Sequence, residues 1–227
     1  MENFSLFDFL SWYIVFIYSM VLHEASHAYA SWKLGDSTAY DQGQVSLDPT
    51  PHVKREPFGM VLVPIASFLS AGWMLGWASA PYDPHWAARY PKKSAIMAAA
   101  GPAANLAICL GSFILIKAGL ATGLFTFASY WDMSHVVISQ VKDWTYVAAQ
   151  LLSIAFTLNF ILMLFNLLPV PPLDGSAIVK LFLPESACKA YDDFLRSPGL
   201  PLVGLLVAWY VFPYFGRPAL RWAVMLV

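Results

Sequence analysis

The stretch from Leu6 to Trp32 is long and apolar enough to cross a membrane, yet it contains His23, Glu24 and His27. A spanning helix needs about 20 predominantly apolar residues, and hydrocarbon solvates ionisable side chains poorly. Something inside the membrane must therefore satisfy two imidazoles and a carboxylate. A bound metal ion is the simplest candidate, because imidazole nitrogens and carboxylate oxygens are common metal ligands.

These residues form the H-E-x-x-H sequence His23-Glu24-Ala25-Ser26-His27. Residues four apart share one face of an α-helix, so both imidazoles can bind one ion. Glu24 can face a water bound to that ion and accept its proton as the water attacks a carbonyl. A haem held between two helices needs only one ligand from each, so the pair argues against haem. The pattern favours a hydrolytic zinc site over histidines that only fill a core.

The composition indicates that most of the chain lies in a membrane. Hydrophobic residues make up 59% of the 227 residues and charged residues 12%, whereas a soluble domain has about 25% charged residues. We expect a single membrane-embedded domain over residues 1–227, with a core at 6–183 and C-terminal membrane segments at 199–227. The net charge of −1 gives no basic face for nucleic acid. Cys109 and Cys188 are far apart in the sequence, and we expect no disulfide framework or cysteine-rich metal site.

The distribution of apolar stretches predicts an all-α multi-pass membrane protein with about 4–6 membrane segments. Between the first two stretches, Gly43 to Leu47 is a strand-like run that could form an edge strand near the site. Such an edge could hold an unwound substrate in an extended conformation, and the alternative is a plain loop. His52 follows this run and could contribute to the same cleft, although a solvated or structural role is favoured. The predicted membrane segments are residues 6–32, 57–79, 94–117, 144–168 and 200–215.

A third metal ligand is needed, because catalytic zinc usually has three protein ligands and one open position. The best candidate is Asp174, which lies just beyond the predicted span 144–168 in a proline-rich turn. Prolines end the helix and restrict the turn, and Gly175 can adopt dihedral angles closed to other residues. We therefore expect the carboxylate of Asp174 to be held in place rather than mobile.

The order and spacing of these motifs resemble the site-2 protease family of intramembrane zinc metalloproteases. Besides the first motif, the resemblance rests on Gly101-Pro102 with Asn105, and on the run from Asn166 to Leu173-Asp174-Gly175. It covers the chain from the first span to about residue 183. The chain is similar to the minimal bacterial form of the family, which lacks a PDZ domain.

The resemblance implies that His23, His27 and Asp174 bind one zinc ion and that Glu24 is the general base. It also implies that Asn166 steadies the substrate or the oxyanion. Asn105, within a predicted helix, could hydrogen-bond across helices and orient a metal ligand, or could make only a structural polar contact.

The position of the expected site constrains the topology. His27 lies near the end of the first span and Asp174 just past the end of 144–168, so both ends must lie on one side of the membrane. If 57–79 and 94–117 both crossed, the two ends would face opposite sides. We therefore predict that 57–79, which is interrupted by Pro64 and three glycines, dips in and returns on the side it entered. Non-helical backbone is tolerated there if protein or a water-filled cavity covers it.

The distribution of positive charge supports this topology. Nine of the 13 lysines and arginines then lie on the side of the metal site and four on the other, whereas full crossing gives seven against six. Cytoplasmic loops carry the excess of lysine and arginine, so we expect a protein of the cell (inner) membrane with its active site toward the cytoplasm. The nine residues are Lys33, Lys54, Arg55, Arg89, Lys92, Lys93, Lys180, Lys189 and Arg196.

The sequence thus predicts a metalloendopeptidase with one zinc ion per chain, embedded in the lipid bilayer and acting on transmembrane protein substrates. Zinc and Glu24 would activate water, while zinc and Asn166 would stabilise the oxyanion. One alternative is a non-catalytic membrane scaffold of the same fold, against which the presence of Glu24 and all three ligands argues. Another is a metal transporter, which would need more intramembrane carboxylates than the sequence offers.

Overall fold

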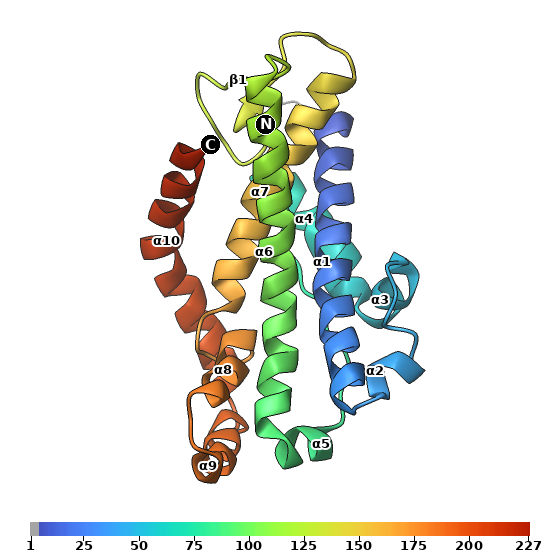
Figure 1. Ribbon diagram of the computed structural model, residues 1–227, viewed down its shortest axis with the longest axis vertical. Helices are drawn as coiled ribbons and strands as arrows, with labels where there is room; N and C mark the ends of the chain where they lie inside the picture. The colour runs from blue at the N-terminus through green and yellow to red at the C-terminus, as the bar shows by residue number, and fades with distance from the viewer. Residues whose placement is uncertain (1–4) are drawn as a thin grey trace.

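The computed structural model describes residues 5–227, and within them four helices are long and apolar enough to cross a membrane (Figure 1). They match four of the predicted segments to within a few residues, except that the last helix extends further. This confirms the all-α multi-pass fold. The four helices are α1 (Leu6–Leu34), α6 (Pro91–Ala121), α7 (Trp144–Asn166) and α10 (Leu200–Leu226).

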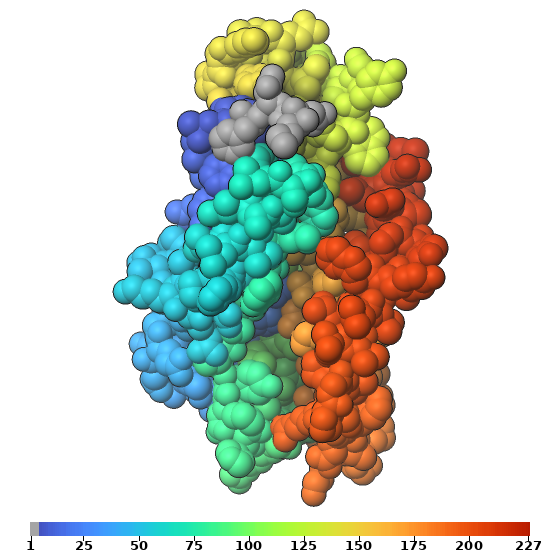
Figure 2. Space-filling model, turned by 180° about the vertical axis from the view of Figure 1, so that it is seen from behind, coloured from blue at the N-terminus to red at the C-terminus, as the bar shows by residue number. Residues whose placement is uncertain are grey.

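Three of these helices form the centre of the molecule. Helix α6 packs against both α1 and α7, which also contact each other, whereas α10 packs mainly on α7. Seen from behind, α10 stands apart from the segment that contains α4, with a hollow between them (Figure 2). The helices run alternately up and down, so the end of α1 and the start of α6 lie at one end of the bundle (Figure 1).

Local sequence signals set the ends of the helices. Helix α1 begins after Ser5, whose hydroxyl accepts a hydrogen bond from the backbone N–H of Asp8 at 3.2 Å. It ends at Gly35, whose φ of 108° lies in the left-handed region that glycine adopts without strain. Helix α7 begins after Asp143, whose carboxylate accepts from the backbone N–H of Thr145 at 2.8 Å. These caps satisfy backbone groups that the helices leave free at their ends.

The predicted non-crossing segment contains a short helical stretch, formed by η1 (Phe58–Leu62) and α4 (Val63–Ala71). At 1.5 Å per residue this stretch is about 21 Å long, shorter than the roughly 30 Å of a hydrocarbon core. The chain turns at Gly72 and runs back, so that the N–H of Trp77 donates to the carbonyl of Gly59 at 3.2 Å. A Cβ on Gly59 would lie 2.2 Å from the Trp77 carbonyl oxygen, so only glycine permits this approach.

The remaining elements are short. Near the end of α1 are α2 (Thr38–Asp41) and α5 (Pro84–Arg89), α3 (Pro49–Arg55) lies beside α1, and after α7 come α8 (Asp174–Ile178), η2 (Val179–Leu181) and α9 (Glu185–Leu195) (Figure 1). At the opposite end, the loop between α6 and α7 contains an antiparallel pair of two-residue strands, β1 (Thr126–Phe127) and β2 (Val137–Ile138).

The prediction of a strand-like element at 43–47 is wrong, because the structure has a turn and bends there. Gly43 lies in a turn with a φ of 71°, and residues 45–47 form bends. The carbonyl oxygen of Ser46 lies 3.0 Å from Nε2 of the buried His52, which fastens this loop to α3. Within residues 5–227 the only strand pairing is that of β1 with β2, so the run has no neighbouring strand to complete a ladder.

Candidate metal centre

Helix α1 places His23 and His27 on one face, one turn apart and almost completely buried. The two residues are 5% and 7% exposed, and their Nε2 atoms lie 3.0 Å apart. Helix α8 brings Asp174 to the same point. Its Oδ2 lies 3.1 Å from Nε2 of His23 and 3.4 Å from Nε2 of His27. Two segments about 150 residues apart in the sequence thus meet inside the bundle.

The three atoms have the spacing that a tetrahedral metal site requires. Bonds of about 2.0–2.1 Å from zinc to nitrogen or oxygen place two ligand atoms of a tetrahedron about 3.3 Å apart. The observed separations are 3.0, 3.1 and 3.4 Å. Among the described residues, His23, His27 and Asp174 are also the only such group of histidine, cysteine or acidic side chains.

The outer nitrogens of the two imidazoles face hydrogen-bond acceptors. Nδ1 of His27 lies 2.8 Å from the backbone carbonyl oxygen of Met97, which can only accept, so Nδ1 carries the proton. Nδ1 of His23 lies 2.6 Å from Oδ1 of Asn105. Both Nε2 atoms then point their lone pairs at Oδ2 of Asp174, a buried atom with no hydrogen-bond donor among the described residues. Three converging lone pairs repel one another, and a cation at their centre removes that cost.

Helix α6 approaches this group through Gly101. A Cβ at this position would lie 2.3 Å from Nε2 of His27 and 2.5 Å from Nε2 of His23. Real side chains do not tolerate such distances, so any residue larger than glycine would displace the imidazoles. The glycine of the Gly101-Pro102 motif is thus required because the two imidazoles leave no room for a side chain.

Glu24 follows His23 directly and is 4% exposed. No hydrogen bond joins its carboxylate to any other residue of the described chain, so the oxygens are free to accept a proton from water. Its position on α1 is about 100° around the helix from His23, to one side of the metal group. This placement suits a general base that does not itself bind the metal.

Close packing holds Asp174 in position. A Cβ on Gly175 would lie 2.3 Å from the carbonyl oxygens of Leu167 and Leu168, so α8 folds back tightly onto the end of α7. Lys180, in the short helix after α8, forms a buried ion pair with Asp192 of α9 at 3.0 Å. These contacts tie the segment that carries the third ligand to its neighbours.

A second anchor comes from α6. Nζ of Lys92 donates to the backbone carbonyl oxygens of Lys180, Leu181 and Leu183, at 2.9, 3.0 and 2.5 Å. A cation at the carboxyl end of a helix also interacts favourably with the helix dipole. The start of α6 is thereby joined to the segment that follows Asp174.

The other candidate residues lie elsewhere. Nδ2 of Asn166 donates to the carbonyl of Leu162 within α7, at 3.1 Å, and no contact to the metal group is found in the described chain. Its role toward substrate therefore stays a prediction. His52 is 1% exposed and holds the loop at Ser46, so it is structural rather than part of a cleft. Sequence reasoning missed Asn159, a fully buried amide on α7 that hydrogen-bonds to Asn105 at 2.8 Å.

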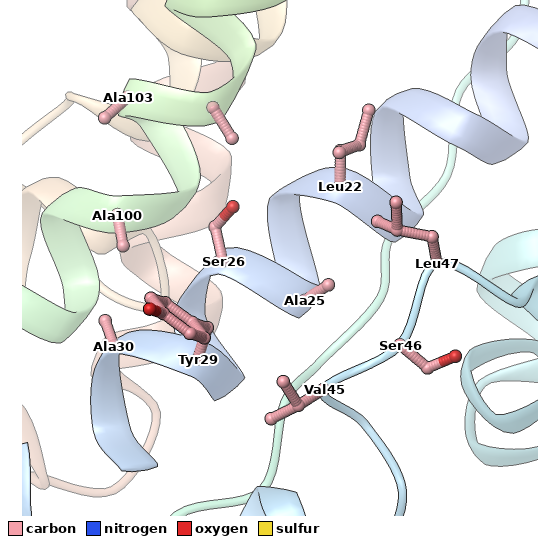
Figure 3. Close-up of a pocket in the computed structure, with 11 residues that line it drawn as sticks. Leu22, Ala25, Ser26, Tyr29, Ala30, Val45, Ser46, Leu47, Ala100 and Ala103 are labelled. Atoms are coloured by element: carbon pink, nitrogen blue, oxygen red, sulfur yellow. The ribbon is translucent and has the colours of Figure 1, made fainter. Parts of the chain in front are cut away.

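A cavity of about 540 Å³ lies between α1, α6 and the loop at Val45 (Figure 3). Alanines, Ser26 and Tyr29 form much of its wall (Figure 3). None of the three metal-group residues lines it, and neither does Glu24. On α1 the lining residues lie roughly opposite Glu24, so this cavity is a recess beside the site and not its opening.

A spanning helix with two buried histidines and an adjacent glutamate, joined by an aspartate from the short helix α8, defines a membrane metallopeptidase. Residues 11–197 match the family described as Peptidase family M50, so the chain belongs to that family, which includes the site-2 proteases. It is therefore a metalloendopeptidase, as the sequence predicted.

Several relatives support this assignment. YwhC of Bacillus subtilis (strain 168) is 34% identical over 172 residues, which cover 75% of this chain and 68% of YwhC. Rip2 of Mycolicibacterium smegmatis is 27% identical over 83% of this chain and 63% of its own length. Rip2 of Mycobacterium tuberculosis (strain H37Rv) is 31% identical over 74% of this chain and 56% of its own length. This chain thus spans less than two thirds of either Rip2. All three relatives are named as zinc metalloproteases, in agreement with the expected cofactor. No solved structure matches the chain significantly.

Proposed function

We propose that this protein is a zinc-dependent intramembrane endopeptidase that hydrolyses peptide bonds in or near transmembrane segments of membrane proteins. The observation that carries the proposal is the metal group itself, because two of its members, His23 and His27, are buried on a helix long enough to span a membrane. A scissile bond must reach that depth to be cut. The names of the relatives, and the fit of the three ligand atoms, support zinc as the ion.

His23, His27 and Asp174 would hold the zinc ion through Nε2, Nε2 and Oδ2. When bound, zinc lowers the pKa of a water molecule and polarises the substrate carbonyl. Glu24 takes the proton of the attacking water as the oxygen bonds to the carbonyl carbon. It then delivers that proton to the amide nitrogen as the carbon–nitrogen bond breaks, so Glu24 ends in its starting state.

A lateral route for the substrate is consistent with the shape of the molecule. Figure 2 shows a hollow between the segment around α4 and helix α10, with atoms in the colours of α1 and α7 visible at its floor. Helix α10 packs mainly on α7. A transmembrane substrate would enter here from the bilayer, and its helix would unwind to expose the scissile amide.

The cytoplasmic orientation of the site is also part of the proposal. The ends of α1 and α7, with α2, α5, α8 and α9, gather at one end of the bundle (Figure 1). By sequence, nine of the 13 lysines and arginines belong to segments that approach this end. The positive-inside rule places such an end in the cytoplasm. The chain would then form one membrane domain over 1–227, with the segment 57–79 entering and leaving on that side.

The test is cleavage of a panel of single-span model substrates by purified protein in detergent, beside Glu24→Gln, with zinc content measured in both. We expect the variant to keep its zinc and to lose activity by about 10²–10⁴-fold, the contribution typical of general acid–base catalysis. Zinc retention without cleavage by either protein would favour the scaffold. Zinc movement across vesicles containing the protein would favour a transporter. Equal cleavage by the variant would remove the proposed role of Glu24.

A further inference from the structure

A chain of buried polar side chains connects the three central helices at the depth of the metal group. Ser19 on α1, Asn105 on α6 and Asn159 on α7 are 2%, 0% and 0% exposed. Polar groups at such depth are costly unless each one finds a partner. The hydrogen bonds that satisfy them run toward His23, so their directions decide what that imidazole presents to the metal.

The directions follow from one backbone acceptor. Nδ2 of Asn159 lies 2.8 Å from the carbonyl oxygen of Ala155, which can only accept, so the amide nitrogen of Asn159 must face it. The same nitrogen donates to the hydroxyl of Ser19 at 2.9 Å. The oxygen of Asn159 therefore faces Asn105 and accepts from its Nδ2 at 2.8 Å. This leaves the oxygen of Asn105 facing Nδ1 of His23 at 2.6 Å.

We propose that Asn159 is a positioning residue that, through Asn105, fixes the tautomer and the ring orientation of His23. An oxygen opposite Nδ1 requires a proton on that nitrogen, which leaves Nε2 unprotonated and aimed at the metal position. Hydrogen bonds to the outer nitrogen of a histidine ligand commonly set its tautomer in this way. The inference rests on the metal site of the proposed function, and it adds a residue on α7 that touches no ligand atom itself.

The two histidines are oriented by different means. The partner of His27 is the backbone carbonyl of Met97, whose direction no side-chain substitution reverses. The partner of His23 is an amide that can present either oxygen or nitrogen, so its direction depends on the next residue. Only His23 therefore needs a second residue behind its partner, and Asn159 is that residue.

The experiment measures zinc affinity of the purified full chain by competition with a chromogenic chelator. Asn159→Leu removes both ends of the amide, and Asn159→Ala provides a second variant if leucine impairs folding. We expect zinc to bind about 10–100-fold more weakly, the range found when outer partners of metal ligands are lost. With cobalt in place of zinc, the absorption bands of the bound ion should shift in the same variants, because the geometry at His23 changes.

Two further variants separate positioning from general structure. Thr157→Val removes another fully buried polar side chain of α7, whose hydroxyl bonds to Met133 and Ser153 instead of to Asn105. It should lower the melting temperature of the metal-free protein as Asn159→Ala does, but keep wild-type zinc affinity. Ser19→Ala leaves the contact of Asn159 with Ala155, and so should reduce affinity less than threefold.

The serial arrangement gives a final test. Because Asn159 acts through Asn105, the double variant Asn105→Leu/Asn159→Leu should bind zinc no more weakly than Asn105→Leu alone. Three results would overturn the inference and leave the metal site intact. They are additive losses of zinc affinity in the double variant, wild-type zinc affinity in both Asn159 variants, and an equal loss of zinc affinity in Thr157→Val. If the wild-type chain itself bound no zinc, both the proposed function and this inference would fail.

Discussion

Helices α1 and α10 are both long and apolar enough to span a membrane, but they bury different residues. Helix α1 buries His23, Glu24 and His27, whereas the buried positions of α10 are glycine, alanine and leucine. The outward face of α10 exposes large apolar and aromatic side chains, such as Tyr210 at 70%. Buried ionisable groups thus mark α1 as the functional helix, whereas the two arginines of α10, Arg217 and Arg221, are exposed and its other outward side chains are largely apolar, as expected of a helix that faces lipid.

This difference predicts that small changes next to α1 affect metal binding most, and that changes on α10 affect mainly stability. The contrast depends on where each helix makes its closest contacts. Helix α1 meets Gly101 of α6 at the imidazoles, and α10 meets the loop before Asp174 at Gly204. Three predictions follow this contrast from the metal group outward.

The largest effect is expected for Gly101→Ala. The new methyl group would lie 2.3 Å from Nε2 of His27 and 2.5 Å from Nε2 of His23, so both rings must move. Misplaced ligands cost metal affinity and activity, and we expect each to fall by at least about 100-fold. Gly111→Ala on the same helix is the matched control, because its methyl group would meet no other atom within 4 Å.

Zinc content, chelator competition and substrate cleavage measure this prediction. The control should behave as wild type in all three. Wild-type zinc affinity in Gly101→Ala would show that the imidazoles do not occupy the described positions. The comparison between α1 and α10 would then lose its basis.

A smaller effect is expected for Gly204→Ala. Its Cβ would lie 2.0 Å from the carbonyl oxygen of Pro171, so α10 must shift away from the loop that leads to Asp174. Overpacking of this kind typically costs about 1–3 kcal/mol. The melting temperature in detergent should fall, and zinc affinity should fall less than in Gly101→Ala.

Leu206→Ala is the control for α10, since Leu206 is 61% exposed and its loss should change stability by no more than about 0.5 kcal/mol. A loss of zinc affinity in Gly204→Ala as large as that in Gly101→Ala would contradict the comparison. Helix α10 would then be part of the metal site's support and not a peripheral helix.

The sequence predicted the helices well because membrane spans have a strong local signal of length and apolarity. It also predicted the meeting of His23, His27 and Asp174, since the first pair shares a helix face and the third follows a fixed turn. The short segment at 57–79 followed from the requirement that both ligand-bearing ends share a side. These inferences need only local patterns and the number of crossings.

The partnership of Asn159 with Asn105 could not be predicted, because it depends on how α6 and α7 are rotated against each other. Helix α6 has apolar residues on all sides, so its sequence does not indicate which face meets α7. The strands β1 and β2 have two residues each, too few to show an alternating pattern. The run 43–47 had such a pattern but no partner strand, and pairing needs both.

The smallest effect is expected far from the metal, in the loop between α6 and α7. There Nδ1 of His135 lies 3.1 Å from the carboxylate of Asp132. The hydrogen bond raises the pKa of His135, against partial burial, and the charges of Asp132 and Asp8 add to it. The pKa of Asp132 is lowered, first by its hydrogen bond from His135 and also by backbone N–H groups.

The sign of the pH dependence follows from these directions. The contribution of His135 is fully present below its ordinary pKa of about 6.5 and is lost as pH rises through its raised value in the folded protein. The contribution of Asp132 is lost as pH falls below its ordinary range. Both side chains are partly exposed, at 34% and 64%, so solvent screening limits the pair to about 0.5 kcal/mol.

His135→Gln should lower the melting temperature slightly at pH 5.5 and leave it unchanged at pH 9. A larger decrease at pH 9 would reverse the sign and remove the ion pair from the explanation. At each of the two pH values the variant should bind zinc as tightly as the wild type, because this loop lies at the end of the bundle away from α8.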